Sequence, residues 1–372
     1  MTKIKVLHII KSLGRGGAEM LLPETLLLHD KDKFEFHYIY FLPWKDQLVE
    51  HIKTHGGKVT CFNANNNLQL MTRRNKVVSY IREHDINLIH AHLPWAGFLA
   101  RYAVNKGNRI LFYTEHNKQE RYHWLTALLN RYTFNRQSLA IAVSADVQKS
   151  IQKNISPSVL VRLLLNGVNT IKFSRDVKSG QRIRQENDIP LDAIVVGTIS
   201  VFRSQKRLKE WVNVFYTALE SNPNLFGIIV GDGLLKNEVI DEISKLKLQQ
   251  KILLPGLQVN TVEWLSSMDI FMMTSRFEGL PIALLEAMSC KCAVVSTDAG
   301  GIKEVIPDRE CGGLLRGVDD FRLLSQDLLT LTSDQPQLKE MGKKARKRVV
   351  AKFSLNRMVA RLEDLYSEYT RF

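Results

Sequence analysis

Short apolar runs recur along the chain and alternate with longer segments in which apolar residues return every three or four positions. The runs predict strands that are buried on both faces, because a strand with one face in solvent would alternate apolar and polar residues. The longer segments predict amphipathic helices. In the first half of the chain the predicted strands are residues 4–10, 34–41, 58–62, 87–90, 110–114 and 139–143.

The same alternation begins again in the second half of the chain. Strands that alternate with helices are typical of a parallel sheet with helices on both faces. The sequence therefore predicts an α/β protein with two Rossmann-like, doubly wound domains, residues 1–170 and residues 171–354. The predicted strands of the second domain are residues 193–197, 226–230, 252–254, 270–273 and 293–296.

A length of 372 residues fits two domains of ordinary size. Hydrophobic residues make up 45% of the chain and charged residues 24%, which excludes a disordered or fibrous protein. No run approaches the ~18 apolar residues that cross a bilayer. The apolar run at residues 4–10 contains His8 and leads into a basic stretch, so it does not resemble a signal peptide. We therefore expect a cytoplasmic protein.

Cysteine content and charge narrow the picture further. Four cysteines are too few for a disulfide scaffold in a chain of this size, and we interpret them as reduced core thiols. The net charge is +14, and residues 1–170 hold 23 Lys and Arg against 12 Asp and Glu. This asymmetry indicates either an anionic partner or merely a solubilising surface.

Ligands of doubly wound sheets bind beyond the carboxyl ends of the strands, so residues that follow strands are candidates. The segment 275–288 follows a predicted strand, turns at Gly279 and continues into a helix in whose first turn Pro281 fits. The unpaired amides of such a helix start suit a diphosphate. Glu278 precedes this helix, and Glu286 lies among apolar residues, where a carboxylate needs a partner such as ribose hydroxyls. The alternative is that Glu278 is an acidic residue at a helix start and that Glu286 is an ordinary surface residue.

Two other strand ends carry groups that suit phosphate. The turn at Gly16 and Gly17 follows the first strand, although it lacks the last glycine of a dinucleotide fingerprint and could be a plain tight turn. Lys206 and Arg207 follow the first strand of the second domain, with Arg203 one turn earlier. Such cations could face the same phosphates. The alternative is an ordinary basic helix start.

Three histidines share one predicted sheet edge in the first domain. His116 follows the strand 110–114, and His90 and His92 lie at the end of the preceding strand. We expect a functional role for His116 and a cleft or packing role for the other two. No carboxylate stands at ligand spacing in the same loop, so we expect no metal site.

Together these motifs resemble the retaining nucleotide-sugar glycosyltransferases of family 4 (group 1). The resemblance extends over residues 4–365, and residues 278–286 with 298–304 are its most specific part. It implies the GT-B fold, in which two Rossmann-like domains face a cleft, the C-terminal one binding the nucleotide sugar and the N-terminal one the acceptor. It also implies that a terminal helix, residues 355–372, crosses back to the first domain. The shared motifs are Gly-Gly-Ala-Glu, His-Ala-His, Thr-Glu-His, Ala-Val-Ser, Asn-Gly-Val, Gln-Lys-Arg, Gly-Asp-Gly and Phe-Glu-Gly-Leu-Pro followed by a second Glu.

The resemblance also implies roles for single residues in the second domain. Glu286 would bind the ribose hydroxyls, and Glu278 with the amides of Gly279 and Leu280 would hold the donor sugar. Lys206 would hold the diphosphate together with a nearby arginine.

That arginine is where the chain departs from the pattern. Many relatives carry it five residues before the lysine, where this chain has Val201, and Arg203 is the candidate substitute. In the first domain, the turn at Gly16 and Gly17 would help to hold the diphosphate, and His116 would contact the donor sugar. No Asp-x-Asp motif is present, and we expect neither metal nor cofactor, because cations and helix dipoles can stabilise a leaving diphosphate.

We therefore expect a retaining hexosyl- or N-acetylhexosaminyltransferase. Its partners would be a nucleotide-sugar donor and a glycan or lipid-linked acceptor, in the synthesis of capsule, exopolysaccharide or lipopolysaccharide. One alternative is a nucleotide-sugar 2-epimerase of the same architecture, which would turn over the donor without an acceptor. Another is a basic nucleic-acid-binding protein, although the recognition motifs of that class are lacking.

Residues 121–136 predict a helix that combines aromatic, leucine and arginine side chains, and residues 73–76 add basic charge. Such a face suits an anionic membrane surface, so we expect peripheral contact with the inner face of the plasma membrane. The alternative is that Trp124, Leu125 and Leu128 pack into the domain core and that the arginines are merely solvated.

Overall fold

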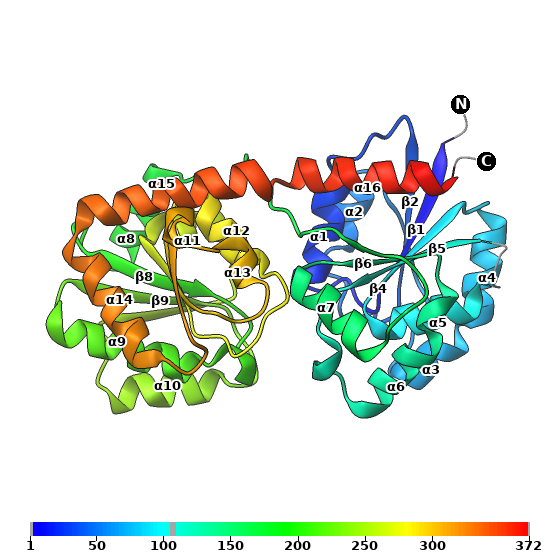
Figure 1. The fold of residues 1–372 in the computed structure, drawn as a ribbon. Helices are drawn as coiled ribbons and strands as arrows, with labels where there is room; N and C mark the ends of the chain where they lie inside the picture. Colours follow the sequence, from blue (N-terminus) through cyan, green and yellow to red (C-terminus); the bar gives the residue numbers. More distant parts are fainter. Residues whose placement is uncertain (1–2, 105–108, 371–372) are drawn as a thin grey trace. The chain divides into compact units, whose positions relative to one another are not determined.

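The computed structural model describes residues 3–104 and 109–370, and the chain divides into two compact units (Figure 1). One unit comprises Met1–Asn166 together with Leu355–Phe372, and the other comprises Gly167–Ser354. The first segment therefore ends shortly before residue 170, where the sequence places the boundary.

The first unit is built on a parallel sheet that has, within the described residues, the strand order β3-β2-β1-β4-β5-β6-β7. The order reverses between β1 and β4, as in a doubly wound sheet, so the predicted fold class is confirmed. The sequence pattern does not predict β7, because Val161 is the only buried one of its three residues. The strands are β1 Ile4–Ile9, β2 Phe34–Tyr40, β3 Lys58–Cys61, β4 Leu88–His92, β5 Ile110–Glu115, β6 Leu139–Ala142 and β7 Val161–Leu163.

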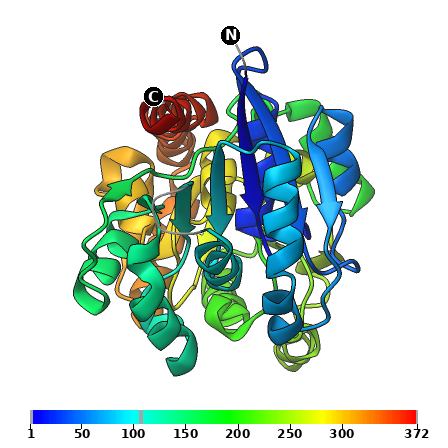
Figure 2. The ribbon, with the colours of Figure 1, turned by 90° about the vertical axis from the view of Figure 1, so that its right-hand side faces the viewer.

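Helices cover both faces of this sheet, which explains why its strands are apolar throughout (Figure 2). One face packs against α3 Asn67–Thr72, α4 Arg74–Glu83, α5 Pro94–Ala103 and α7 Ala145–Asn154. The other face packs against α1 Gly17–Leu26, α2 Val49–Thr54 and α16 Leu355–Thr370. Helix α6, Trp124–Thr133, lies beside α5, between the short 3₁₀ turns η1 Gln119–Arg121 and η2 Phe134–Arg136.

The C-terminal helix α16 is part of the first unit. Leu362, Leu365 and Tyr366 enter its hydrophobic core. The Tyr366 hydroxyl lies 2.6 Å from His90 Nδ1, and Glu363 Oε1 lies 2.9 Å from the Nδ1 of His29. Polar and apolar contacts together therefore fix α16 on the face that α1 and α2 also cover.

The second unit repeats this architecture with a parallel sheet of order β10-β9-β8-β11-β12-β13 in the described residues. Its order reverses between β8 and β11. The strands are β8 Ile194–Ile199, β9 Leu225–Val230, β10 Ile252–Gly256, β11 Ile270–Met273, β12 Ala293–Thr297 and β13 Gly313–Arg316. The other elements are α8 Val177–Glu186, η3 Ser204–Lys206, α9 Leu208–Ser221, α10 Lys236–Lys245, α11 Thr261–Ser267, α12 Ile282–Ser289, α13 Ile302–Val305, η4 Arg309–Cys311, α14 Phe321–Ser333 and α15 Gln335–Lys352.

Candidate functional site

The switch point between β8 and β11 brings Lys206 and Glu278 together. Lys206 Nζ donates to Glu278 Oε1 over 2.6 Å, and the hydroxyl of Ser275 donates to the same oxygen over 2.6 Å. Only 8% of Glu278 is exposed, so the cation and the hydroxyl compensate a carboxylate that has lost most of its water. The sequence places Lys206 and Glu278 at one sheet edge, but it does not identify Ser275 as their partner.

Backbone contacts hold the two loops of this site together. The hydroxyl of Thr274 donates to the carbonyl oxygens of Lys206 and Arg207, and the amide of Arg276 donates to Gln205 over 2.8 Å. The loop that follows β8 and the loop that follows β11 therefore form one surface. Arg276 is exposed on it, a cation that sequence reasoning overlooked.

Two glycines after β12 let a third loop support this surface. A Cβ on Gly301 would lie 2.1 Å from the carbonyl oxygen of Gly279, and one on Gly300 would lie 2.1 Å from that of Glu278. The amide of Gly301 donates to Gly279 over 2.8 Å. Only residues without a side chain allow this close approach. The glycines therefore fix the backbone that the resemblance assigns to the donor sugar.

Helix α12 begins directly after this turn. The sequence predicts Pro281 in the first helical turn, whereas in the structure Pro281 is the N-cap, one position earlier. No side chain caps the helix. The first amides of a helix have no intrahelical acceptor, so such a start attracts anions. Glu286 lies in α12 and is half-buried between the buried residues Leu285 and Ala287.

The arginines near Lys206 differ in their contacts. Arg203 is exposed, and its guanidinium forms no hydrogen bond within the described ranges. Arg207 donates to the carbonyl of Val318 and to Asp319, and its guanidinium lies 4.6 Å from the centre of the Phe321 ring. Residues directly before α14 and its first residue therefore bind Arg207 in this structure, and a contact between Arg207 and the phosphates stays a prediction.

In the first unit, the turn after β1 leads into α1. The N-cap of α1 is Gly16, and a Cβ there would lie 2.2 Å from the carboxylate of Glu19. That carboxylate also accepts a hydrogen bond from Ser12 over 3.0 Å. A Cβ on Gly17, by contrast, would meet no atom within 4 Å. Open space therefore lies beside Gly17, the first residue of α1.

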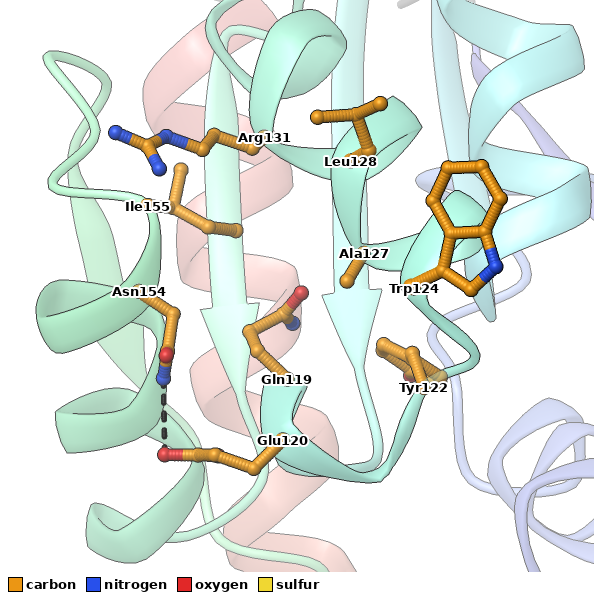
Figure 3. Close-up of a pocket in the computed structure, with 9 residues that line it drawn as sticks. All are labelled: Gln119, Glu120, Tyr122, Trp124, Ala127, Leu128, Arg131, Asn154 and Ile155. Atoms are coloured by element: carbon orange, nitrogen blue, oxygen red, sulfur yellow. Dashed lines mark hydrogen bonds between the residues drawn. The ribbon is translucent and has the colours of Figure 1, made fainter.

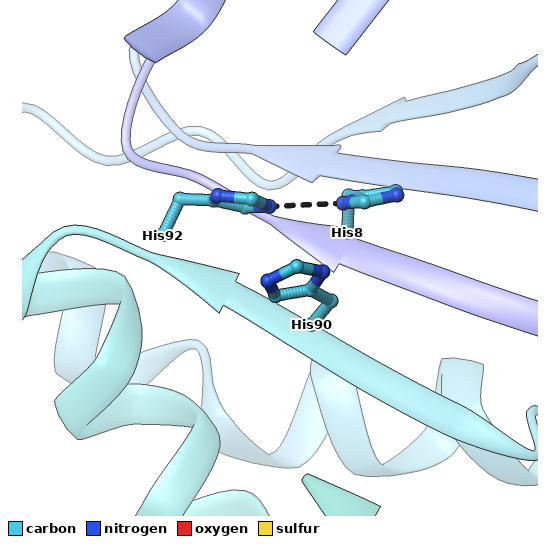
Figure 4. A group of neighbouring side chains, drawn as sticks. All are labelled: His8, His90 and His92. Atoms are coloured by element: carbon cyan, nitrogen blue, oxygen red, sulfur yellow. Dashed lines mark hydrogen bonds between the residues drawn. The ribbon is translucent and has the colours of Figure 1, made fainter. Parts of the chain in front are cut away.

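Three histidines of β1 and β4 form a buried cluster (Figure 4). The Nδ1 atom of His8 lies 2.9 Å from the Nε2 of His92, and both nitrogens of His90 lie 2.6 Å from hydroxyls, those of Tyr366 and Thr114. Burial lowers the pKa of His90 to about 3 and those of His8 and His92 well below the usual value. The three imidazoles are therefore neutral at pH 7.

The same cluster has the composition of a metal site. One ligand atom from each histidine lies within 4.8 Å of the others. Neutral imidazoles are good ligands for zinc and related ions. However, the lone pair or proton of each His90 nitrogen is already directed at a hydroxyl. A metal ion would have to displace Tyr366 or Thr114 and also separate His8 from His92.

His116 follows β5 and lies next to this cluster, with its ring centre 5.8 Å from that of His92. Burial lowers the pKa of His116 to about 4. Its Nε2 and the Nδ1 of His92 are buried and have no hydrogen-bond partner within the described residues. Both rings line a cavity of about 30 Å³, and His116 can therefore offer a neutral nitrogen to a ligand.

Helix α6 and the 3₁₀ turns on either side of it carry exposed apolar and basic side chains, which we call the α6 surface. It comprises Trp124, Leu125, Leu128 and Tyr132 together with Arg121, Arg131 and Arg136. Trp124 is 68% exposed, and Leu125 and Leu128 are 42% exposed. The alternative that these three side chains pack into the core is therefore wrong. None of the helices in the described part of the chain has the length and hydropathy to span a bilayer.

A pocket of about 430 Å³ opens beside the α6 surface. Figure 3 shows Trp124 and Leu128 at one side and Asn154 and Ile155, at the end of α7, at the other. Glu120 accepts a hydrogen bond from Asn154 over 2.9 Å at its base. The pocket thus combines aromatic, aliphatic and polar groups next to exposed arginines.

Comparisons with known proteins bear on the family and the fold of the chain. Residues 15–172 match the family model "Glycosyltransferase Family 4", and residues 179–348 match "Glycosyl transferases group 1". N-acetyl-alpha-D-glucosaminyl L-malate synthase of Bacillus anthracis is 25% identical over 80% of this chain and 78% of its own. The UDP-Gal:alpha-D-GlcNAc-diphosphoundecaprenol alpha-1,3-galactosyltransferase of Escherichia coli is 23% identical over 98% of this chain and 97% of its own. Anabaena Alr3699/HepE, solved with UDP and glucose, superimposes with a TM-score of 0.87 at 21% identity, covering 98% of this chain and 99% of that one.

Proposed function

Because the chain belongs to the group 1 glycosyltransferases, we propose that it transfers a sugar from a nucleotide-diphosphate sugar to a glycan or lipid-linked acceptor and retains the anomeric configuration. The sugar would be a hexose or an N-acetylhexosamine. UDP is the nucleotide that we favour, since relatives and structural neighbours are named for UDP or UDP-sugars.

The observation that carries this proposal is the contact between Lys206 and Glu278 at the β8–β11 switch point. A lysine beside an uncapped helix start suits a diphosphate, and a buried carboxylate one hydrogen bond away suits the hydroxyls of the attached sugar. Glu286 in α12 would then bind the ribose. Arg203 would add a second cation to the diphosphate site.

The proposed reaction needs little covalent chemistry from the protein. The bond between the anomeric carbon and the diphosphate oxygen breaks, and the acceptor oxygen forms the new bond on the same face of the sugar. The acceptor proton passes to the leaving diphosphate. Lys206 and the helix start stabilise the charge that develops on the diphosphate. His116, being neutral, holds the sugar in place and does not act as the base.

We further propose a metal-independent enzyme in which the histidines of β1 and β4 serve a packing role. The hydroxyl partners of His90 and the contact between His8 and His92 support this role. Prolonged dialysis against a chelator should leave the turnover unchanged. Loss of activity on dialysis and its recovery with zinc would instead make the cluster a metal site.

The α6 surface supports a lipid-linked acceptor at an anionic membrane face. Aromatic and leucine side chains beside arginines are the composition of interfacial helices. The Escherichia coli relative is named for an acceptor linked to diphosphoundecaprenol. We therefore propose that the reaction takes place at the cytoplasmic face of the membrane, in the synthesis of surface polysaccharide.

Product analysis tests the proposed function. The protein is incubated with UDP-sugars and an undecaprenyl-diphosphate-linked acceptor, and the anomeric configuration of the product is read by NMR. A product with the donor's configuration supports the proposal, whereas an inverted product contradicts the mechanism. Release of an epimer from the donor alone would make the protein an epimerase.

Glu286→Gln should weaken UDP binding about ten- to a hundredfold, because one charged hydrogen bond is lost. The exposed Asp241→Asn is the control and should bind UDP like the wild-type protein.

A further inference from the structure

Glu115, the residue directly before His116, is fully buried and surrounded by donors. Two of these donors are backbone amides, those of His116 at 3.1 Å and Asn117 at 3.3 Å. The side-chain donors are the hydroxyls of Tyr113 and Tyr122 and the amides of Gln119 and Asn130. Both carboxylate oxygens therefore hold the loop that carries His116.

A buried cation balances this carboxylate from α5. Arg101 is 1% exposed, and its guanidinium lies 4.4 Å from the centre of the Tyr113 ring. It donates to Asn130 Oδ1 over 2.7 Å and to the hydroxyl of Thr133 over 3.0 Å. The nitrogen of the same Asn130 side chain donates to Glu115 over 3.2 Å. Asn130 thus bridges the two buried charges.

Asn130 and Thr133 belong to α6, so the bridge connects two places on the first unit. At one end α6 presents its exposed apolar and arginine side chains, and at the other end Glu115 holds the backbone of His116. Buried charges are costly, and apolar residues of the same volume usually stabilise a core at least as well. Fold stability alone therefore gives no reason for a charged bridge at this point.

We propose that Glu115 is a positioning residue for His116, and that the Arg101–Asn130–Glu115 bridge couples the α6 surface to the His116 loop. The proposal rests on the proposed function, in which His116 contacts the donor sugar. Glu115 itself does not reach the substrate, because it is fully buried and its oxygens are occupied by donors. It acts on the reaction through the position of the His116 ring.

The substitution Glu115→Gln tests this role. It keeps the volume of the side chain, but it points an NH₂ group at hydrogen-bond donors that the carboxylate accepts from, so some of these hydrogen bonds are lost. We expect kcat to fall by up to about a hundredfold, the effect of misplacing a substrate-positioning group, while the KM for the donor changes less than about threefold. The matched control is Glu242→Gln, a buried carboxylate of α10 that accepts from Asn213. This control should retain the wild-type kcat.

A double-mutant cycle separates positioning from general destabilisation. If Glu115 acts through His116, Glu115→Gln should reduce kcat no further in a His116→Ala background. If the kcat of the double variant falls by the product of the two single losses, the inference is overturned, whereas the role of His116 stands. A fully active His116→Ala enzyme would contradict both the inference and the proposed site. If Glu115→Gln does not fold, Tyr122→Phe removes one donor to Glu115 and enters the same cycle with the same expected coupling.

Discussion

Lys206 stabilises the buried carboxylate of Glu278 in the structure, and in the proposed function it also binds the diphosphate. The ammonium group of Lys206 neutralises a carboxylate that is 8% exposed. A bound diphosphate would offer the lysine a second anion. Glu278 would then keep the hydrogen bond from Ser275 and accept new ones from the sugar.

Lys206→Ala should therefore reduce catalysis much more than acceptor binding. We expect kcat to fall about 10²- to 10³-fold, the range found when one preorganised group is removed from a site of developing charge. The KM for the acceptor should stay near the wild-type value. Steady-state kinetics measure both, and Lys209→Ala, an exposed residue of α9, is the control. A variant with wild-type kcat would exclude Lys206 from the diphosphate site.

The buried histidines predict how stability depends on pH. His90 is neutral in the folded protein because burial lowers its pKa to about 3, whereas an unfolded chain binds the proton near pH 6.5. Unfolding therefore takes up a proton between these values. The contribution of neutral His90 to the free energy of unfolding is complete above pH 6.5, and about 1.4 kcal/mol of it is lost for each pH unit between pH 6.5 and about pH 3.

We expect the His90→Gln variant to take up one proton fewer than the wild-type protein when it unfolds. The glutamine amide can still reach hydroxyls, but it does not titrate. Denaturant unfolding between pH 4 and 7 should show a smaller slope of unfolding free energy against pH than for the wild-type protein. The exposed His51→Gln is the control and should keep the wild-type slope. An unchanged slope for His90→Gln would mean that His90 is not the titrating group.

At the scale of elements, the apolar runs predict most strands, because helices cover both faces of each sheet and leave no polar alternation. The sequence does not reveal β7 or β13, since short edge strands carry too few buried residues to form a run. The strand-end rule brings Lys206 and Glu278 to one edge. This rule does not predict that Asp319 accepts a hydrogen bond from Arg207 or that Glu115 accepts one from Asn130 of α6, because it says nothing of contacts between strand ends and other elements.

The loop after β12 supports the turn at Glu278 and Gly279 through a close backbone contact, and Gly301→Ala tests this support. A Cβ at Gly301 would lie 2.1 Å from the Gly279 carbonyl oxygen, so the turn must shift. We expect the free energy of unfolding to drop by about 1–3 kcal/mol, the usual result of overpacking, and UDP binding to weaken. Gly17→Ala is the matched control for stability, because a Cβ there meets no atom within 4 Å. Equal stability of the two variants would contradict the close contact.

At the scale of the whole molecule, the two units divide the proposed chemistry and the charge unequally. The second unit carries the Lys206–Glu278 pair and is nearly neutral, because residues 167–354 hold 26 Lys and Arg against 23 Asp and Glu. Most of the positive charge belongs to the first unit, which also carries His116 and the α6 surface. A basic unit with exposed aromatic and leucine side chains is the one that an anionic membrane would attract.

Flotation with liposomes tests whether the α6 surface meets a membrane. We expect binding to vesicles that contain anionic lipid, and weaker binding as salt rises, because each basic residue near the surface contributes about 1 kcal/mol. Replacing Arg121, Arg131 and Arg136 by Glu should abolish flotation. The matched control makes the same change in net charge at Lys339, Lys343 and Lys347, exposed residues of α15, and should still float. Equal loss in both triple variants would show that net charge, rather than the α6 surface, attracts the protein to lipid. No binding to acidic vesicles at low salt would favour an acceptor that is not held in a membrane.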